Sequence, residues 1–133
     1  LRVEQALRAA SRVQAVQLVS AGGRVFEASA IAGMLRARRL DTYADDLCAS
    51  ACTLVLLAGR QRGAAPQARI GFHRPQFAGQ DDDEPATGHA LLRAYREAGL
   101  GAAFIARVRA TPSQSMWYPA REELLRQHVL TQG

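Results

Sequence analysis

Ser50 and His73 are the two side chains of this chain whose types and positions suit nucleophilic catalysis. Ser50 lies in residues 48–52, which read CASAC, and His73 lies in residues 70–75, which read IGFHRP. A serine hydroxyl is a weak nucleophile, and it is usually activated by a neighbouring base such as histidine. We expect the serine at a strand-to-helix turn and the histidine at the end of the next strand. The two side chains would then meet and could carry out acyl transfer.

His73 is the base that the composition of the chain favours. The chain contains no lysine, so a serine-lysine pair is excluded. His89 follows a predicted loop and His128 is at the end of a predicted terminal helix, whereas His73 is at a predicted strand end. For a single histidine taken alone, a structural role would be at least as frequent. Its coincidence with Ser50 makes the catalytic interpretation the stronger one.

Gly22 and Gly23 are candidates for an oxyanion hole, because glycine lets a backbone N–H group approach a reacting carbonyl closely. A tight turn is the alternative, and it would be favoured for a Gly-Gly pair without other signals. In an α/β sheet, ligands collect at the carboxyl ends of the strands, where both glycines, Ser50 and His73 are predicted. Three segments are therefore expected to converge.

Cys48 and Cys52 flank Ser50, and three interpretations of them remain open at this point. They could form a disulfide, bind a metal with further ligands, or remain buried thiols. The chain has no other cysteine and no histidines at convincing spacing, so no metal site is predicted. The sequence does not separate a disulfide from free thiols. A disulfide would indicate an oxidising compartment.

The elements needed to position these residues alternate along the chain, which predicts an α/β fold with a mainly parallel sheet. An acidic stretch within residues 76–88 predicts an exposed mobile loop rather than a metal site, because its spacing is irregular. Gly99 and Gly101 divide residues 89–109 into two helices or one bent helix. The predicted helices are 3–10, 26–39, 47–58, 89–109 and 119–127, and the predicted strands are 13–19, 41–45, 69–72 and 116–118, with a last strand or turn at 129–130.

Composition limits the class of protein. With 133 residues and 48% hydrophobic content, one domain with one core is expected. The net charge of +5 does not predict a nucleic-acid partner, because arginines cluster only at residues 36–39, where a helix C-terminus favours them. No segment approaches the roughly 20 apolar residues of a membrane span. Because residue 1 is Leu, we expect that an upstream segment has been removed or left out.

Four segments resemble, in the same order, successive motifs of the proteolytic subunit of Clp protease and its relatives. The likeness extends over residues 13–131, and it is greatest to a bacterial periplasmic branch with a Ser-Ala-Cys motif. The segments are Leu18–Gly23, Cys48–Leu54 followed by Ala58-Gly59, Ile70–Pro75 and Trp117–Leu124.

The resemblance implies a ClpP/crotonase-type fold, a spiral of ββα units, in a single domain over residues 1–133 that lacks the first strand of the family. It implies Ser50 as nucleophile, His73 as general base, and the N–H groups of Gly22 or Gly23 and of Ala51 as oxyanion hole. It further implies a peptide or protein substrate, a homo-oligomer, no cofactor and a periplasmic or otherwise exported location.

The third catalytic residue of the family does not have an obvious equivalent here. Its aspartate is expected just before the aromatic at position 117, where this chain has Ser115. Glu122, Asp45 and Asp46 are the alternative carboxylates. In the well-studied triad, replacing the aspartate lowers the rate by about 10⁴.

Three functions remain in consideration. The leading prediction is a ClpP-like serine peptidase or related acyl hydrolase. The second is a degenerate member of the fold that binds peptides or acts as an assembly module, which the missing aspartate favours. The third is a crotonase-like enzyme for coenzyme A thioesters, which would leave the pairing of Ser50 with His73 unexplained.

Overall fold

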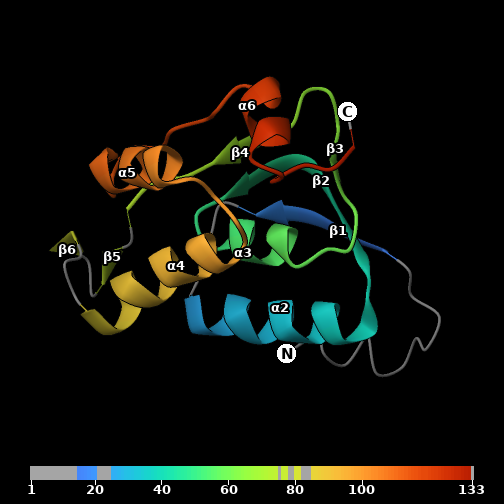
Figure 1. Cartoon of the computed structure of the whole chain (residues 1–133), viewed down its shortest axis with the longest axis horizontal. Coiled ribbons are helices and arrows are strands. Elements are labelled where there is room, and N and C mark those ends of the chain that lie inside the picture. The colour runs from blue at the N-terminus through green and yellow to red at the C-terminus, as the bar shows by residue number, and fades with distance from the viewer. Residues whose placement is uncertain (1–14, 21–24, 75, 78–79, 82–84, 133) are drawn as a thin grey trace.

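The computed structural model describes residues 15–20, 25–74, 76–77, 80–81 and 85–132 (Figure 1). The predicted helix at residues 3–10 lies outside this part of the chain. Within it, none of the helices has the length and apolar character needed to span a membrane. The elements are β1 (Ala15–Ser20), α2 (Val25–Arg38), β2 (Asp41–Ala49), α3 (Cys52–Leu57), β3 (Arg62–Ala64), β4 (Arg69–Gly71), β5 (Gln76–Phe77), β6 (Gln80–Asp81), α4 (Pro85–Glu97), α5 (Ala102–Ala110) and α6 (Arg121–Arg126).

A four-stranded parallel sheet is built around β2, which confirms the predicted α/β class. One edge of β2 pairs with β1. The other edge pairs first with β3, where Tyr43 lies opposite Gly63, and then with β4, where Cys48 lies opposite Ile70. Because all these pairings are parallel, β2 and β4 end at the same edge of the sheet. Their carboxyl ends lead directly to Ser50 and to His73.

Helices cover the sheet from two sides. In Figure 1, α2 lies on one side of the strands and α6 lies on the other, while α3 packs against both β2 and α2. One apolar core joins these layers, because parallel strands need cover on both faces. Its largest side chains below 2% exposure are Tyr95, Phe72, Leu35, Leu56, Ile70, Leu91, Leu130, Val108 and Val129.

The predicted helix at residues 47–58 is wrong for its first part. β2 continues through Ala49, a turn follows at residues 50–51, and α3 begins only at Cys52. A central parallel strand buried on both faces has the same continuous apolar composition as a buried helix. Hydrogen-bonding partners on both edges make Leu47, Cys48 and Ala49 a strand.

Other differences concern short elements. β3 was not predicted, because Arg62-Gly63-Ala64 has no β-branched or aromatic residue. The loop predicted at residues 76–88 is wrong where it contains β5 and β6, which pair antiparallel, and the start of α4. The predicted strand at residues 116–118 is a single bridge between Phe72 and Trp117.

The division of residues 89–109 into two helices is confirmed. α4 ends at Glu97 and α5 begins at Ala102. Gly99 lies between them with a φ of +96°, a conformation that only glycine adopts readily. The chain therefore turns here, and both helices contact Phe72, the residue after β4, through Tyr95 of α4 and Phe104 of α5.

Candidate active site

Ser50 occupies a sharp turn between β2 and α3 and has a φ of +56°. A positive φ is unfavourable for a residue with a side chain, by about 1–3 kcal/mol, so surrounding contacts must hold it. The Ser50 N–H donates to the Gly71 carbonyl over 2.9 Å. The Ser50 carbonyl accepts from the Thr53 N–H at 3.0 Å and from Thr53 Oγ1 at 2.6 Å. Both sides of the serine are therefore fixed by hydrogen bonds.

A disulfide between Cys48 and Cys52 spans the same turn. Cys48 is near the end of β2 and Cys52 is the first residue of α3, and their Cα atoms are 5.4 Å apart. Both residues are buried, at 0% and 6% exposure. The structure thus selects the disulfide among the three interpretations of these cysteines, and it braces the segment that carries Ser50.

Replacing both cysteines by alanine should lower the free energy of unfolding by about 2 kcal/mol. The effect is at the low end for a disulfide because the two cysteines are only four residues apart in the sequence and close a short loop. Denaturant unfolding would measure this as a lower midpoint with an unchanged slope. The wild type with and without a thiol reductant is the control. An unchanged midpoint in the double variant would contradict a stabilising role for the disulfide.

His73 contacts Ser50 through one ring nitrogen and the main chain through the other. Nε2 is 2.9 Å from Ser50 Oγ, and Nδ1 is 2.9 Å from the carbonyl oxygen of Ser115. Because a carbonyl can only accept, Nδ1 must carry the proton. In the neutral ring, Nε2 is then unprotonated and accepts from the Ser50 hydroxyl. This is the tautomer that a general base requires.

The Ser115 carbonyl is held in place by the pairing of residues 111–117 with the chain around His73. The N–H groups of Phe72 and Trp117 each donate to the carbonyl of the other, over 2.9 and 2.8 Å. The Arg74 N–H donates to the Thr111 carbonyl over 3.0 Å. These bonds flank His73 on both sides, so its ring faces the Ser115 main chain.

The position predicted for a third catalytic side chain is occupied by this carbonyl. Ser115 contributes its main chain, and its side chain is exposed. Both ring nitrogens of His73 are engaged, so none of Glu122, Asp45 and Asp46 hydrogen-bonds to it. Glu122 and Asp46 are exposed on α6 and β2. Among the residues that the structure describes, no carboxylate therefore completes the pair.

The predicted oxyanion hole is described only in part. Gly22 and Gly23 lie outside the described residues. Ala51 follows Ser50 directly and is 1% exposed. Among the residues that the structure describes, none accepts a hydrogen bond from the Ala51 N–H. Within the described part of the chain this donor is left without an acceptor, and a donor of this kind is what an oxyanion hole needs.

Thr53 and Tyr95 were not predicted, although they complete the hydrogen bonding of the turn. Thr53 Oγ1 lies 2.6 Å from the Tyr95 hydroxyl, and both residues are fully buried. Burial raises the pKa of Tyr95 well above its usual range, so its hydroxyl stays protonated. Thr53 is the only hydroxyl residue in the apolar run 51–58, and this isolated polar group was the available signal.

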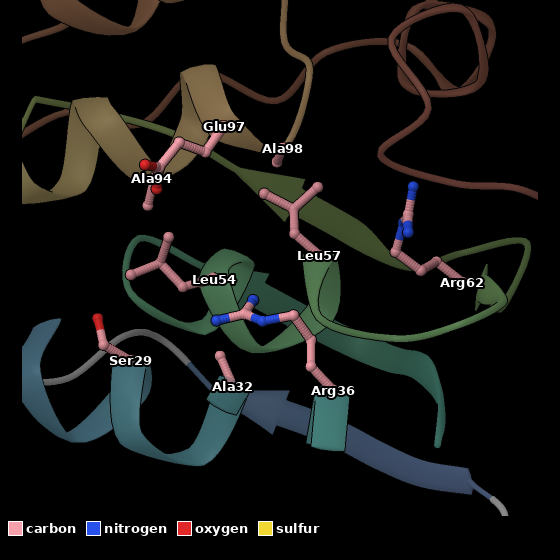
Figure 2. A pocket seen from close by; sticks show the side chains of 9 residues that line it. All are labelled: Ser29, Ala32, Arg36, Leu54, Leu57, Arg62, Ala94, Glu97 and Ala98. Atoms are coloured by element: carbon pink, nitrogen blue, oxygen red, sulfur yellow. The ribbon is translucent and has the colours of Figure 1, made fainter. Parts of the chain in front are cut away.

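A cavity of about 430 Å³ lies between α2, α3 and α4 (Figure 2). Its lining includes Leu54 and Leu57 of α3 and three charged residues, Arg36, Arg62 and Glu97. A second cavity of about 240 Å³ lies beside α4 and α5. Neither includes Ser50 or His73, so the candidate active site is distinct from both.

The sheet topology, together with the strand-to-helix turn at Ser50, defines an α/β protein of the ClpP/crotonase type. No family model matches the sequence, and no curated protein matches it. Among 167 matching solved chains is the ClpP1 N165D mutant from Listeria monocytogenes, with a TM-score of 0.66 and 17% identity. The match covers 97% of this chain and 79% of that one. It confirms the ClpP-like fold.

Proposed function

We propose that this chain is a serine hydrolase of ClpP-like fold that cleaves peptide bonds or related acyl esters. The observation that carries the proposal is the 2.9 Å contact from Ser50 Oγ to His73 Nε2, with Nδ1 directed to the Ser115 carbonyl. Nucleophile, base and an orienting acceptor are thereby aligned.

In the proposed reaction, Ser50 Oγ attacks the substrate carbonyl carbon while its proton passes to His73 Nε2. The negative charge on the carbonyl oxygen is stabilised by the Ala51 N–H. The tetrahedral intermediate collapses, the leaving amine or alcohol takes the proton from Nε2, and an acyl-serine remains. Water then attacks this ester, its proton passes through His73 to Ser50 Oγ, and the acid is released.

The Ser115 carbonyl stabilises a protonated His73 less than a carboxylate would. It fixes the tautomer and the ring orientation, but it brings no full negative charge to stabilise the imidazolium. We therefore propose turnover that is slower than in a triad with aspartate. Substrates with good leaving groups would be hydrolysed most readily, because less proton donation is then needed.

Labelling with a fluorophosphonate tests the proposal. Ser50 Oγ of the wild type should displace fluoride from the reagent and lose its proton, which leaves a phosphonyl group on Ser50 that mass spectrometry of the digested protein identifies. Ser50→Ala is the matched control and should not react. Failure of the folded wild type to react, or labelling at another residue, would overturn the proposed nucleophile.

A peptide-binding or assembly module without turnover is the second candidate. The carbonyl that replaces a carboxylate behind His73 favours it. Peptide binding that is unaffected by Ser50→Ala, in a protein that does not react with the fluorophosphonate, would support this function. Binding of coenzyme A would instead support the crotonase-like alternative.

We also propose that the protein acts in an exported, oxidising compartment, such as the periplasm, and as a homo-oligomer. The buried disulfide between Cys48 and Cys52 supports the compartment, because such bonds persist under oxidising conditions. Fractionation of cells expressing the full-length gene tests the location, and light scattering of the purified protein tests the assembly.

A further inference from the structure

A chain of three hydrogen-bonding groups runs from the buried core to Ser50. It starts at the Tyr95 hydroxyl on α4, passes through Thr53 Oγ1 on α3, and ends at the Ser50 carbonyl. Both of its contacts are 2.6 Å long, and Tyr95 and Thr53 are each 0% exposed. Sequestered polar groups with such short contacts define one geometry strongly.

The direction of the protons in this chain follows from its ends. The Ser50 carbonyl can only accept, so Thr53 must donate its single hydroxyl proton to it. The Tyr95 hydroxyl must therefore donate to Thr53. Tyr95 remains a donor at any ordinary pH, because burial raises its pKa. With the Thr53 N–H, the Ser50 carbonyl thus receives two donors from one residue.

The same peptide unit contains the predicted oxyanion donor. The Ser50–Ala51 peptide is trans, so its carbonyl and the Ala51 N–H point in opposite directions within one plane. Holding the carbonyl against Thr53 aims the N–H away from the first turn of α3. Hydrogen bonds to the carbonyl also polarise the peptide and strengthen its N–H as a donor.

We infer that Thr53 and Tyr95 are positioning residues that orient and polarise the Ser50–Ala51 peptide, so that the Ala51 N–H can stabilise the oxyanion. The inference rests on the proposed hydrolase function and extends it to residues that do not touch the substrate. It accounts for a fully buried pair of hydroxyl groups beside a serine with positive φ.

The test compares three variants with a matched control in the wild-type background. Thr53→Val removes the donor to Ser50, Tyr95→Phe removes only the second bond, and Thr53→Ser keeps the hydroxyl. Thr42→Val is the control, because buried Thr42 donates to the Leu56 carbonyl at 2.7 Å, at the far end of the same helix. It removes the same kind of bond without touching the Ser50 peptide.

Hydrolysis of p-nitrophenyl acetate gives the first measurement. We expect kcat to fall about tenfold in Thr53→Val and about threefold in Tyr95→Phe, with KM unchanged, since an oxyanion donor acts mainly in the transition state. Thr53→Ser and Thr42→Val should retain the wild-type kcat. If kcat for Tyr95→Phe and for folded Thr53→Val matches that of Thr42→Val, the inference is overturned. If Thr53→Val does not fold, the comparison of kcat between Tyr95→Phe and Thr42→Val alone tests the inference.

A second measurement does not depend on turnover. The ¹H–¹⁵N resonance of the Ala51 amide should shift in Tyr95→Phe and Thr53→Val, and remain in place in Thr42→Val. An unchanged Ala51 resonance overturns the inference even if the wild type is an active hydrolase. Absence of fluorophosphonate labelling in the wild type, with a shifted Ala51 resonance, would contradict the proposed function while the role of Thr53 and Tyr95 in the peptide geometry is upheld.

Discussion

Replacing His73 with alanine should lower Ser50-dependent hydrolysis by at least about 10³-fold. The reason is that Nε2 of His73, 2.9 Å from Ser50 Oγ, is the only base in contact with the hydroxyl among the described residues. Without it, the serine must lose its proton to water. Initial rates on p-nitrophenyl acetate and the rate of fluorophosphonate labelling both measure the effect.

Ser115→Ala is the matched control for this experiment. Ser115 orients His73 through its main-chain oxygen, so loss of its hydroxyl should leave the rate almost unchanged. A fall in the rate of Ser115→Ala comparable to that of His73→Ala would show that the Ser115 side chain, rather than its carbonyl, orients His73. A folded His73→Ala variant with wild-type rate would exclude His73 as the base.

Phe72→Ala should cost about 3–5 kcal/mol of unfolding free energy, the largest stability effect we expect. Phe72 is 0% exposed and directly precedes His73. Its ring centroid lies 5.6 Å from that of Tyr95 and 5.0 Å from that of Phe104, both in edge-to-face geometry. Removing the ring would leave a large cavity between β4, α4 and α5.

Urea unfolding followed by tryptophan fluorescence would measure this loss. Tyr118→Ala is the control, because Tyr118 is 40% exposed and should change stability by only about 0.5 kcal/mol. The loss of unfolding free energy in Phe72→Leu should lie between those of Phe72→Ala and Tyr118→Ala, since leucine retains most of the apolar volume. Equal losses in Phe72→Ala and Tyr118→Ala would contradict a central role for the Phe72 ring.

The α/β class and the approach of Ser50 to His73 could be predicted, because alternating elements constrain where parallel strands end. The residue at which β2 ends could not be predicted from the sequence. Leu47, Cys48 and Ala49 have the composition of a buried helix, and only their pairing with β1 and β4 makes them a strand. Short β3 is likewise defined by its neighbour rather than by its own residues.

The acceptor behind His73 could not be predicted for a different reason. A main-chain carbonyl is present at every residue, so its use leaves no mark on the residue type at position 115. The residue types of the sequence therefore indicate only carboxylates such as Glu122, Asp45 and Asp46 as possible partners of His73. The contact of Thr53 with Tyr95 joins residues 42 positions apart in the sequence, and no periodic pattern in the sequence indicates it.

The contacts of His73 also indicate when the candidate site forms during folding. Its partners lie 23 residues before it and 42 residues after it, so the site joins three separate parts of the chain. Contacts between such distant residues form late in folding, because long loops must close first. A chain folded only as far as β4 has no oriented base, because the carbonyl of residue 115 is not yet packed against His73. The orientation of His73 therefore depends on the closure of two long loops, and a chain without residue 115 would contain the histidine without its orienting acceptor.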